Sequence, residues 1–443
     1  MKRLIAIIFL ALSLGCPAQE QMSIDSCITL AVRNNHKLAA VRKGVDAAQY
    51  DVRHAKSYFF PSFSATGMGL YSTANGHLGI PAGPLPVTGP AGLTGESAWF
   101  PGFDLDYSVK GIYKGGVKFD QPIYFGGKIK TGYEMSKLGL EMSRMNVRKT
   151  TADIIVETVN AYADVVKCDN LLSLAQSYKS LLSELYRVTE SAVRNGVKTR
   201  SDLLRVKVKL EEADLGIVKA RNGRQLAAMM LSTCIGIPYN PDITFKPEMP
   251  AVPDEAPLVG DFTNRPEYNL LEMNRELSRK NVALAKSDQR PQIGLTGSYG
   301  YTHGLELNGN NMAHKWNFFI GVNVNIPIYH FGERINKVKA SRARFEQTCE
   351  DMRHAEELMR LDMTQAAVRL EESWMAYGIA ESGVKSAEEN LRMSEKMYRQ
   401  GVETLTELLD AQTAWLEMSQ NLVEASVDRY RQWVEYQRTV GNL

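Results

Sequence analysis

The sequence predicts an α+β membrane protein in which amphipathic β-strands alternate with unusually long helices. Residues 317–328 alternate between apolar and mostly polar side chains, and twelve residues are about the length of a tilted strand that crosses a bilayer. A polar, helical sequence of 67 residues, 333–399, follows this strand, and a proline-free helical sequence of the same length, 128–194, lies earlier in the chain. Membrane strands attached to long polar helices are therefore the predicted plan.

The strand at residues 317–328 has two contrasting faces. A soluble sheet with one buried face shows the same alternation, so the pattern alone leaves a soluble and a membrane strand open. The apolar face consists of Phe318, Ile320, Val322, Val324, Ile326 and Ile328, and the other face of Asn317, Phe319, Gly321, Asn323, Asn325 and Pro327.

The N-terminus predicts export. Lys2 and Arg3 precede an apolar run at residues 4–14, and small residues follow, so residues 1–18 are predicted to be a secretory signal peptide. Cleavage after Ala18 is favoured, and lipid attachment at Cys16, behind an imperfect lipobox, is the alternative. No other segment approaches the roughly 18 to 20 consecutive apolar residues of a transmembrane helix.

Composition and motifs give no support for an enzyme, a cofactor or a nucleic-acid partner. The net charge is only +2, and the five cysteines lack the paired spacing of a disulfide framework or a metal site. Gly126-Gly127-Lys128 lacks the frame of a phosphate-binding loop, and none of the seven histidines forms an HExxH motif. The 18 methionines are dispersed at helical spacing, which indicates core packing rather than a metal pathway.

The chain contains two copies of one plan. Residues 196–204 return as 401–409 at an offset of 205, and residues 122–129 return as 327–335 at the same offset with one residue inserted. Asn34 and Pro61 match Asn264 and Pro291 at an offset of 230, so the first copy carries 25 extra residues, which we predict to form an enlarged loop around residues 74–95. The predicted organisation is a first repeat at 19–236, a proline-rich linker at 237–262 and a second repeat at 263–443.

Each repeat is predicted to contain a short helix, a strand hairpin, a long helix and a return helix. Pro61 ends the first short helix, Gly126-Gly127 ends the first hairpin, and Asn195-Gly196 and Gln400-Gly401 break the long helices. The first repeat is predicted as helix 24–56, strands 63–71 and 107–124, and helices 128–194 and 201–231. The second is predicted as helix 266–286, strands 293–301 and 317–328, and helices 333–399 and 404–439.

Helix length predicts how the helices are arranged, and strand number predicts an oligomer. A helix of 67 residues is about 100 Å long, so two shorter helices stacked end to end are expected beside it. Apolar steps of three and four predict coiled-coil packing. Four strands cannot close a membrane barrel, because the smallest have about eight, and dimer, trimer and tetramer remain open on this ground. The stripes are Leu203, Val206, Leu210, Ala213, Ile217 and Ala220, and Val384, Ala387, Leu391, Ser394 and Tyr398.

The chain resembles the outer membrane efflux protein family, the TolC-like channels. The resemblance covers residues 24–441, and its most specific motifs are YRQGVET at 398–404 continuing into ELLDAQ at 407–412, NGVKT at 195–199 and IDSCITLAVRNN at 24–35. It implies a homotrimer with a 12-stranded β-barrel in the outer-membrane lipid of a Gram-negative bacterium. Long coiled-coil helices would then form a tunnel through the periplasm.

The resemblance also implies a function. A TolC-like channel is the exit duct of a tripartite efflux or secretion system, and it passively conducts substrates from an inner-membrane pump of the RND, ABC or MFS type through a periplasmic adaptor. The sequence does not choose between drug, metal and protein as substrate. An exported coiled-coil scaffold without channel activity is the alternative function.

The helix-hairpin turns are the candidate functional sites. By resemblance, the turns dock the adaptor, and acidic residues one turn further line the periplasmic aperture. A left-handed glycine turn and a capping box at Thr404 and Glu407 are ordinary structural alternatives. The predicted docking residues are Gly196, Val197, Thr199, Gly401, Val402 and Thr404, and the predicted aperture residues are Glu407, Asp410, Tyr398, Arg205 and Asp202.

The two tips carry opposite charge, which suggests a latch. Lys198 and Arg205 in the first copy stand where Glu403 and Asp410 stand in the second. We hypothesise that Arg205 pairs with Asp410 or Glu407 of a neighbouring hairpin and holds the aperture closed until docking breaks these pairs.

Overall fold

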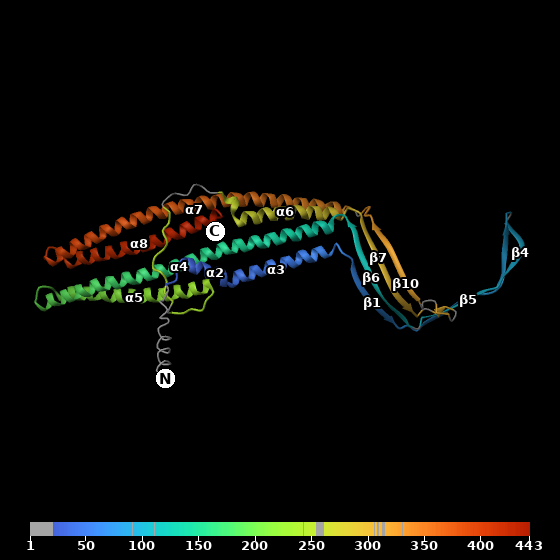
Figure 1. Ribbon diagram of the computed structural model, residues 1–443, viewed down its shortest axis with the longest axis horizontal. Coiled ribbons are helices and arrows are strands. Elements are labelled where there is room, and N and C mark those ends of the chain that lie inside the picture. The colour runs from blue at the N-terminus through green and yellow to red at the C-terminus, as the bar shows by residue number, and fades with distance from the viewer. Residues whose placement is uncertain are drawn as a thin grey trace, which may run out of the picture. The chain divides into compact units, whose positions relative to one another are not determined.

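The computed structural model describes residues 21–90, 92–109, 111–241, 243–253, 261–304, 306–307, 310–311, 315–329 and 331–443 (Figure 1). The predicted signal peptide and Cys16 lie outside these described residues. The chain divides into two compact units, which consist of Met1–Ala47, Leu140–Arg275 and Thr348–Leu443, and of Ala48–Gly139 and Glu276–Gln347. Over the described ranges, no helix has both the length and the apolar character needed to span a membrane.

Seven α-helices account for most of the described chain. The two long helices begin and end at the predicted residues, because each runs without proline up to an Asn-Gly or Gln-Gly turn. The helices are α2 (Ile24–Asn34), α3 (His36–Ser57), α4 (Lys128–Arg194), α5 (Arg200–Ile235), α6 (Pro266–Ser287), α7 (Glu333–Arg399) and α8 (Leu405–Thr439), with a 3₁₀ turn at Phe262–Asn264.

The predicted helix at residues 24–56 is split in two by Asn35. Its backbone is extended, with φ −64° and ψ 123°. Its side-chain oxygen accepts hydrogen bonds from the backbone N–H groups of Lys37 and Leu38, as an N-cap residue does. Asn35 therefore ends α2 and starts α3, a break that helical periodicity does not reveal.

Short helices meet end to end in both repeats, as predicted. The Asn35 amide donates a hydrogen bond of 3.2 Å to the Cys234 carbonyl, next to the end of α5. A Cβ atom on Gly236 would lie 2.9 Å from the Asn34 carbonyl oxygen, and one on Gly441 would lie 2.7 Å from the Asn264 carbonyl carbon. The end of each return helix thus abuts the start of a short helix.

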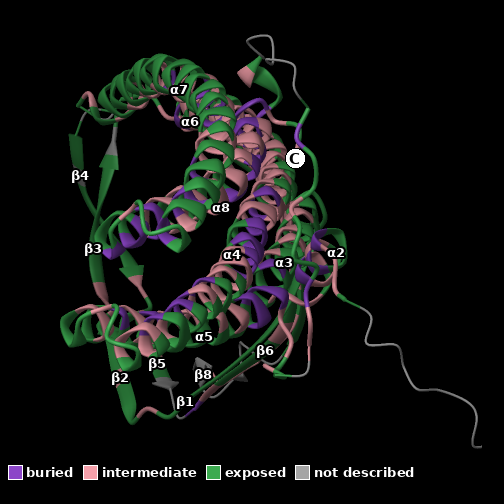
Figure 2. Cartoon of the chain, turned by 90° about the vertical axis from the view of Figure 1, so that its left-hand side faces the viewer, coloured by how far each residue is buried: buried purple, intermediate pink, exposed green. Residues whose placement is uncertain are grey.

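The core of the first unit lies among α2, α4, α5 and α8 (Figure 2, purple). Cys27 and Leu231 are fully buried there, and the Tyr162 hydroxyl donates hydrogen bonds to the carbonyls of Met22 and Lys246. Burial raises the pKa of the Cys27 thiol to about 12. The four described cysteines are free thiols and are buried or half-buried.

The second unit contains a four-stranded antiparallel sheet of order β1-β6-β7-β10. Its strands are β1 (Ser62–Leu70), β6 (Ile112–Phe125), β7 (Gln292–His303) and β10 (Lys315–Asn325). A depression of about 950 Å³ is lined by Ser62, Asp120, Thr296 and Asn323, one residue from each strand. A depression that spans four adjacent strands lies on a concave face, and the register places the polar side chains of Ser62, Asp120 and Thr296 together on one face.

The opposite, convex face of the sheet is apolar. Val322 pairs with Leu295, and Phe318 with Tyr299. Trp316 stacks on Tyr299 at one end of this face. Phe318, Ile320, Val322 and Val324 are all more than half exposed in the single chain. An apolar band ending in aromatic residues is typical of a membrane strand.

β10 ends at Asn325, three residues before the predicted end of the strand. It is an edge strand, whereas the last residues of β6, Tyr124 and Phe125, pair with β7. Within one chain, residues 326–328 lie beyond the paired part of β10, and Ile328 is 92% exposed. The strand is shorter than predicted because residues 326–328 have no strand to pair with inside one chain.

The predicted enlarged loop at residues 74–95 is wrong, because this region forms strands. β2 (Ala74–Ile80) pairs with β5 (Phe103–Val109), and β3 (Gly83–Gly89) pairs with β4 (Gly92–Phe100). Two short strands, β8 (Glu306–Leu307) and β9 (Asn310–Asn311), extend the β2-β5 sheet. The many glycines and prolines obscured a two-residue alternation, in which Leu78 pairs with Leu105 and His77 with Asp106.

Candidate functional site at the helix-hairpin tips

Glycine closes both long helices in the same way. Gly196 and Gly401 have φ angles of +74° and +77°. The next backbone N–H, of Val197 or Val402, donates back into the preceding helix, to the carbonyl of Ala192 at 2.8 Å or of Met397 at 3.0 Å. The predicted left-handed turn is confirmed. Val197 and Val402 are 73% and 71% exposed, so both turns present an apolar side chain to solvent in the single chain.

Capping boxes start both return helices. The Thr404 hydroxyl accepts the Glu407 N–H, and the Glu407 carboxylate accepts the Thr404 N–H at 2.7 Å. Thr199 and Asp202 make the same reciprocal pair. These hydrogen bonds lower the pKa values of both carboxyl groups. The capping role considered for Glu407 is confirmed, and Asp202, placed only at the aperture from sequence, also caps its helix.

Tyr398 lies in the core between the two hairpins. It is 8% exposed, and the Lys198 ammonium lies 4.9 Å from the centre of its ring. The surrounding cluster draws on all four hairpin helices. Lys198 belongs to the first turn and Tyr398 to the end of α7, so this contact joins the two tips. The cluster includes Leu182 and Leu185 of α4, Val206 of α5, Leu391 of α7 and Leu405, Leu408 and Leu409 of α8.

Arg205 and Asp410 line one depression between α5 and α8. The depression has a volume of about 430 Å³, and Leu204, Val208 and Leu409 supply its apolar wall. The Arg205 Nη1 donates a hydrogen bond of 3.2 Å to the Thr406 hydroxyl. Within one chain, therefore, Arg205 bonds the Thr406 hydroxyl rather than the carboxylate of Asp410 or Glu407. The aperture role of these residues stays a prediction.

Sequence reasoning missed the cross-hairpin roles of Lys198 and Thr406 and the position of Lys209. Glu212, and less strongly Asp410, raises the pKa of Lys209, which also lines the depression. In the sequence, Lys198 contributes only to the charge contrast between the tips, and nothing there predicts its cation–π contact with Tyr398. An offset of 205 between the repeats aligns Ser201 with Thr406, but it does not predict which side chains meet across hairpins.

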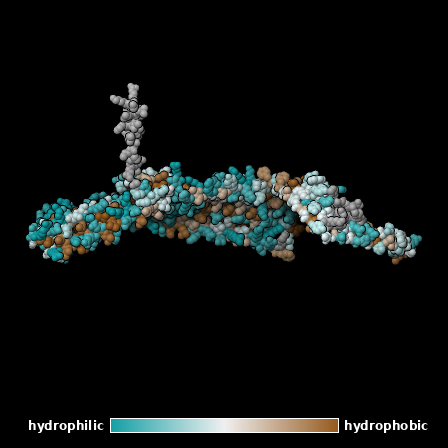
Figure 3. Space-filling model, turned by 90° about the horizontal axis from the view of Figure 1, so that it is seen from below, coloured by the Kyte–Doolittle hydropathy of each residue, from teal (hydrophilic) through white to brown (hydrophobic). Residues whose placement is uncertain are grey.

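Exposed apolar stripes on α5 and α7 also escaped the sequence analysis. Their members recur at spacings of three, four, seven or more residues, beside the buried coiled-coil stripe, so a second heptad search would have found them. Apolar side chains are exposed along the helices on the face drawn in Figure 3. The stripes are Leu204, Val208, Leu215, Val218, Leu226 and Met229 on α5, and Leu358, Leu361, Val368, Met375, Ile379, Met393 and Met397 on α7.

Potential metal ligands do not cluster in the described residues, at the tips or elsewhere. Within this part of the chain, no group of three or more His, Cys, Asp or Glu side chains is arranged to hold a metal ion. His303 ends β7, is half-buried and stacks on Tyr113, with the two ring centroids 6.4 Å apart. His314 lies outside the described residues.

Comparisons with known proteins agree with this architecture. The family model described as "Outer membrane efflux protein" matches residues 27–237 and 263–442. TolC of Vibrio cholerae is 21% identical over 75% of this chain and 77% of its own length, and BepC of Brucella suis is 22% identical over 92% and 82%. The CmeC channel of Campylobacter jejuni, 18% identical, superposes with a TM-score of 0.75 over 94% of this chain and 85% of its own.

The family match covers both repeats and most of the chain. The α+β TolC-like fold and the outer-membrane location expected from the sequence are thereby confirmed. The chain belongs to the outer membrane efflux protein family, whose members are transport ducts rather than enzymes.

Proposed function

We propose that three copies of this chain form the outer-membrane exit duct of a tripartite efflux or secretion system. The observation that carries the proposal is the four-stranded sheet with a polar concave face, an apolar convex face and two edge strands, β1 and β10. Unpaired strand edges are not tolerated in lipid, and pairing β10 of one copy with β1 of the next removes them. Three sheets then give a closed barrel of 12 strands with a wet lumen.

The apolar stripes on α5 and α7 support the trimer independently. A heptad stripe of Leu, Val and Met is unfavourable on a helix that faces only water, because burial of each such side chain stabilises the protein by about 1.5–3 kcal/mol. We propose that these stripes pack against helices of neighbouring copies and form the periplasmic tunnel.

In this proposal the duct carries out no reaction and needs no cofactor. An inner-membrane pump of the RND, ABC or MFS type supplies the energy, and a periplasmic adaptor joins pump and duct. The exposed Val197 and Val402, and the caps at Thr199 and Thr404 beside them, are the surface offered to the adaptor. The turns at Gly196 and Gly401 hold these side chains at the extreme ends of the hairpins.

The first test is channel formation by the purified protein. We expect a heat-modifiable trimer that needs detergent for extraction from outer membranes and that conducts ions in a planar lipid bilayer. The coiled-coil scaffold alternative predicts extraction by salt or urea alone and no conductance, and that outcome would refute the duct.

The latch hypothesis predicts the effect of reversing one charge. Arg205→Glu places a carboxylate beside Asp410 in the depression, so we expect the aperture to open more often. One exposed pair is worth about 1 kcal/mol at most, but three related pairs shift the closed-to-open ratio by roughly 100-fold. Lys207→Glu is the control, because Lys207 lies on α5 outside the residues that line the depression. Equal open probability and equal single-channel conductance for Arg205→Glu and Lys207→Glu would disprove the latch.

A further inference from the structure

The helix ends next to the four-stranded sheet form a basic collar, which we define as residues 48–57, 128–139, 276–290 and 333–347. The collar contains fourteen Lys and Arg residues and six Asp and Glu residues, a net charge of +8, although the whole chain carries only +2. The remaining residues therefore sum to −6. Positive charge is concentrated in this one part of the chain.

The collar borders one end of the sheet. α3 leads into β1 and α6 into β7, while α4 follows β6 and α7 follows β10. The register places Ser62 beside Asp120 and both Phe125 and Asn325 beside Gln292, so all four connections leave the same end of the sheet. The N-termini of α4 and α7 also lie here, and a helix N-terminus adds partial positive charge.

Within the collar, α4, α6 and α7 enclose a pocket of about 360 Å³, here called the collar pocket. Three cationic side chains line it, Lys128, Lys337 and Arg344. The only carboxylate among its lining residues, Asp288, bonds Lys337 at 2.6 Å and Lys128 at 3.3 Å. The hydrogen bond from Lys337 lowers the pKa of Asp288. The charged side chains that line the collar pocket, one carboxylate and three cations, sum to +2.

The other walls of the collar pocket suit a phosphate ester. Ser278 and Ser341 bring hydroxyl groups and Asn281 an amide group to the lining, while Leu284 and Ala285 form an apolar wall. Hydroxyl, amide and guanidinium donors together satisfy phosphate oxygens. The apolar wall makes no favourable contact with a free inorganic ion, but it can pack against the glycerol and first methylene groups of a lipid.

We propose that the collar pocket binds the phosphate of an anionic phospholipid headgroup in the periplasmic leaflet of the outer membrane. The proposal rests on the position of the pocket at the end of a sheet with an apolar convex face, where the headgroups of the bilayer meet the protein. The remaining basic residues of the collar hold the same leaflet by less specific attraction. Bound lipid would fix the depth of the protein in the membrane.

The test measures lipid binding by the purified full-length protein. Short-chain phosphatidylglycerol is titrated into detergent solution, and the increase in unfolding temperature gives an affinity, with phosphatidylcholine of the same chain length as the zwitterionic comparison. We expect phosphatidylglycerol to stabilise the wild type. Arg344→Gln should bind it about fivefold more weakly, the effect of losing one cation worth about 1 kcal/mol at a membrane surface. Arg344→Lys should retain most of the binding.

Arg342→Gln is the matched control, because it removes the same charge from an exposed residue of α7 that does not line the pocket. Four outcomes would overturn the proposal. They are equal stabilisation by phosphatidylcholine, equal stabilisation by inorganic phosphate, an equal loss of binding in Arg342→Gln, and a changed ion selectivity of Arg344→Gln channels with unchanged lipid binding. The last would assign the pocket to the conduction path.

Discussion

Arg265→Ala is expected to lower the free energy of unfolding of the first unit by about 2–3 kcal/mol, although Arg265 lies far from the hairpin tips in the sequence. Arg265 is only 5% exposed, and its Nη1 donates a hydrogen bond of 3.0 Å to Asp362. Its Nε lies 3.8 Å from a Glu267 oxygen. Removing one member of a buried pair costs about 3–5 kcal/mol, and the half-exposed Asp362 reduces that cost.

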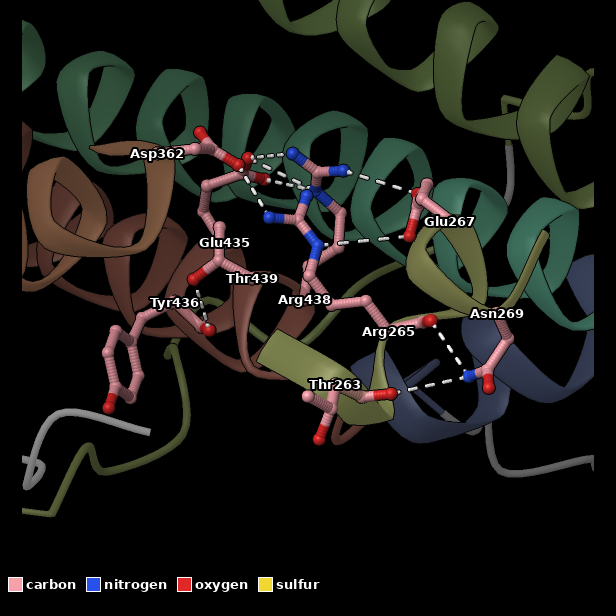
Figure 4. Close-up of polar contacts among 9 residues, drawn as sticks. All are labelled: Thr263, Arg265, Glu267, Asn269, Asp362, Glu435, Tyr436, Arg438 and Thr439. Atoms are coloured by element: carbon pink, nitrogen blue, oxygen red, sulfur yellow. Dashed lines mark hydrogen bonds and ion pairs between the residues drawn. The ribbon is translucent and has the colours of Figure 1, made fainter. Parts of the chain in front are cut away.

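The substitution would also weaken a network of ion pairs that joins α6, α7 and α8 (Figure 4). The other Glu267 oxygen lies 3.9 Å from Arg438 Nη1, and Arg438 also bonds Glu435 at 2.7 Å. Glu435, Asp362 and Glu267 together raise the pKa of Arg438. Arg265 therefore helps to hold the start of α6 against the middle of α7 and the end of α8, the end-to-end junction of the second repeat.

The measurement is the urea midpoint of the helical circular dichroism signal in detergent. Arg265→Lys keeps one charge but reaches a single carboxylate, so it should fall between wild type and Arg265→Ala. Arg275→Ala is the control, since Arg275 makes only an exposed pair with Glu272 and should change stability by less than about 0.5 kcal/mol. Equal midpoints for Arg265→Ala and Arg275→Ala would show that the buried network contributes nothing.

The long helices were predictable because local signals determine their ends. α4 and α7 contain no proline and stop at Asn195-Gly196 and Gln400-Gly401, where only glycine adopts the left-handed conformation easily. The duplication helped to predict the other elements, because a helix or strand in one repeat has a counterpart in the other. Asn35 shows the limit of this approach, because a polar residue in a helical pattern becomes a cap only when its side chain turns to the backbone.

Contacts between distant residues were not predictable from the sequence. Arg205 meets Thr406 across 201 residues, and Lys198 meets Tyr398 across 200, so packing of the two hairpins decides both pairs. The same holds for the strands at residues 74–109, since glycine-rich ribbons pair through their backbones and leave little trace in side-chain composition. Charge contrast between the tips was visible in the sequence, but the bonding partner of each charge was not.

Gly126→Ala is expected to reduce the yield of folded trimer more than any other single methyl addition at the junction of strand and helix. Gly126 has a φ angle of +63°, and an added Cβ would lie 2.3 Å from the Ser287 carbonyl oxygen and 2.9 Å from the Arg290 Cβ. The left-handed backbone costs about 1–2 kcal/mol with a side chain, and the clash with backbone about 1–3 kcal/mol more. Arg290 would also lose its 3.2 Å hydrogen bond to the Gly126 carbonyl.

Alanine substitutions at Gly127 and Gly132 are the controls. They separate the effect of the steric clash at Gly126 from the effects of backbone strain and of the added methyl group. Gly127 has a φ angle of +90°, but its Cβ would meet only the flexible Arg290 guanidinium at 3.5 Å, so Gly127→Ala tests backbone strain alone. Gly132 lies inside α4 with open space around it, and Gly132→Ala should be neutral or stabilising by up to about 1 kcal/mol. The heat-modifiable trimer recovered from outer membranes should therefore decrease in the order Gly132→Ala, Gly127→Ala, Gly126→Ala. If Gly126→Ala and Gly127→Ala gave equal trimer, the close approach of β6 to the end of α6 would not be what fixes the exit of the strand into the long helix.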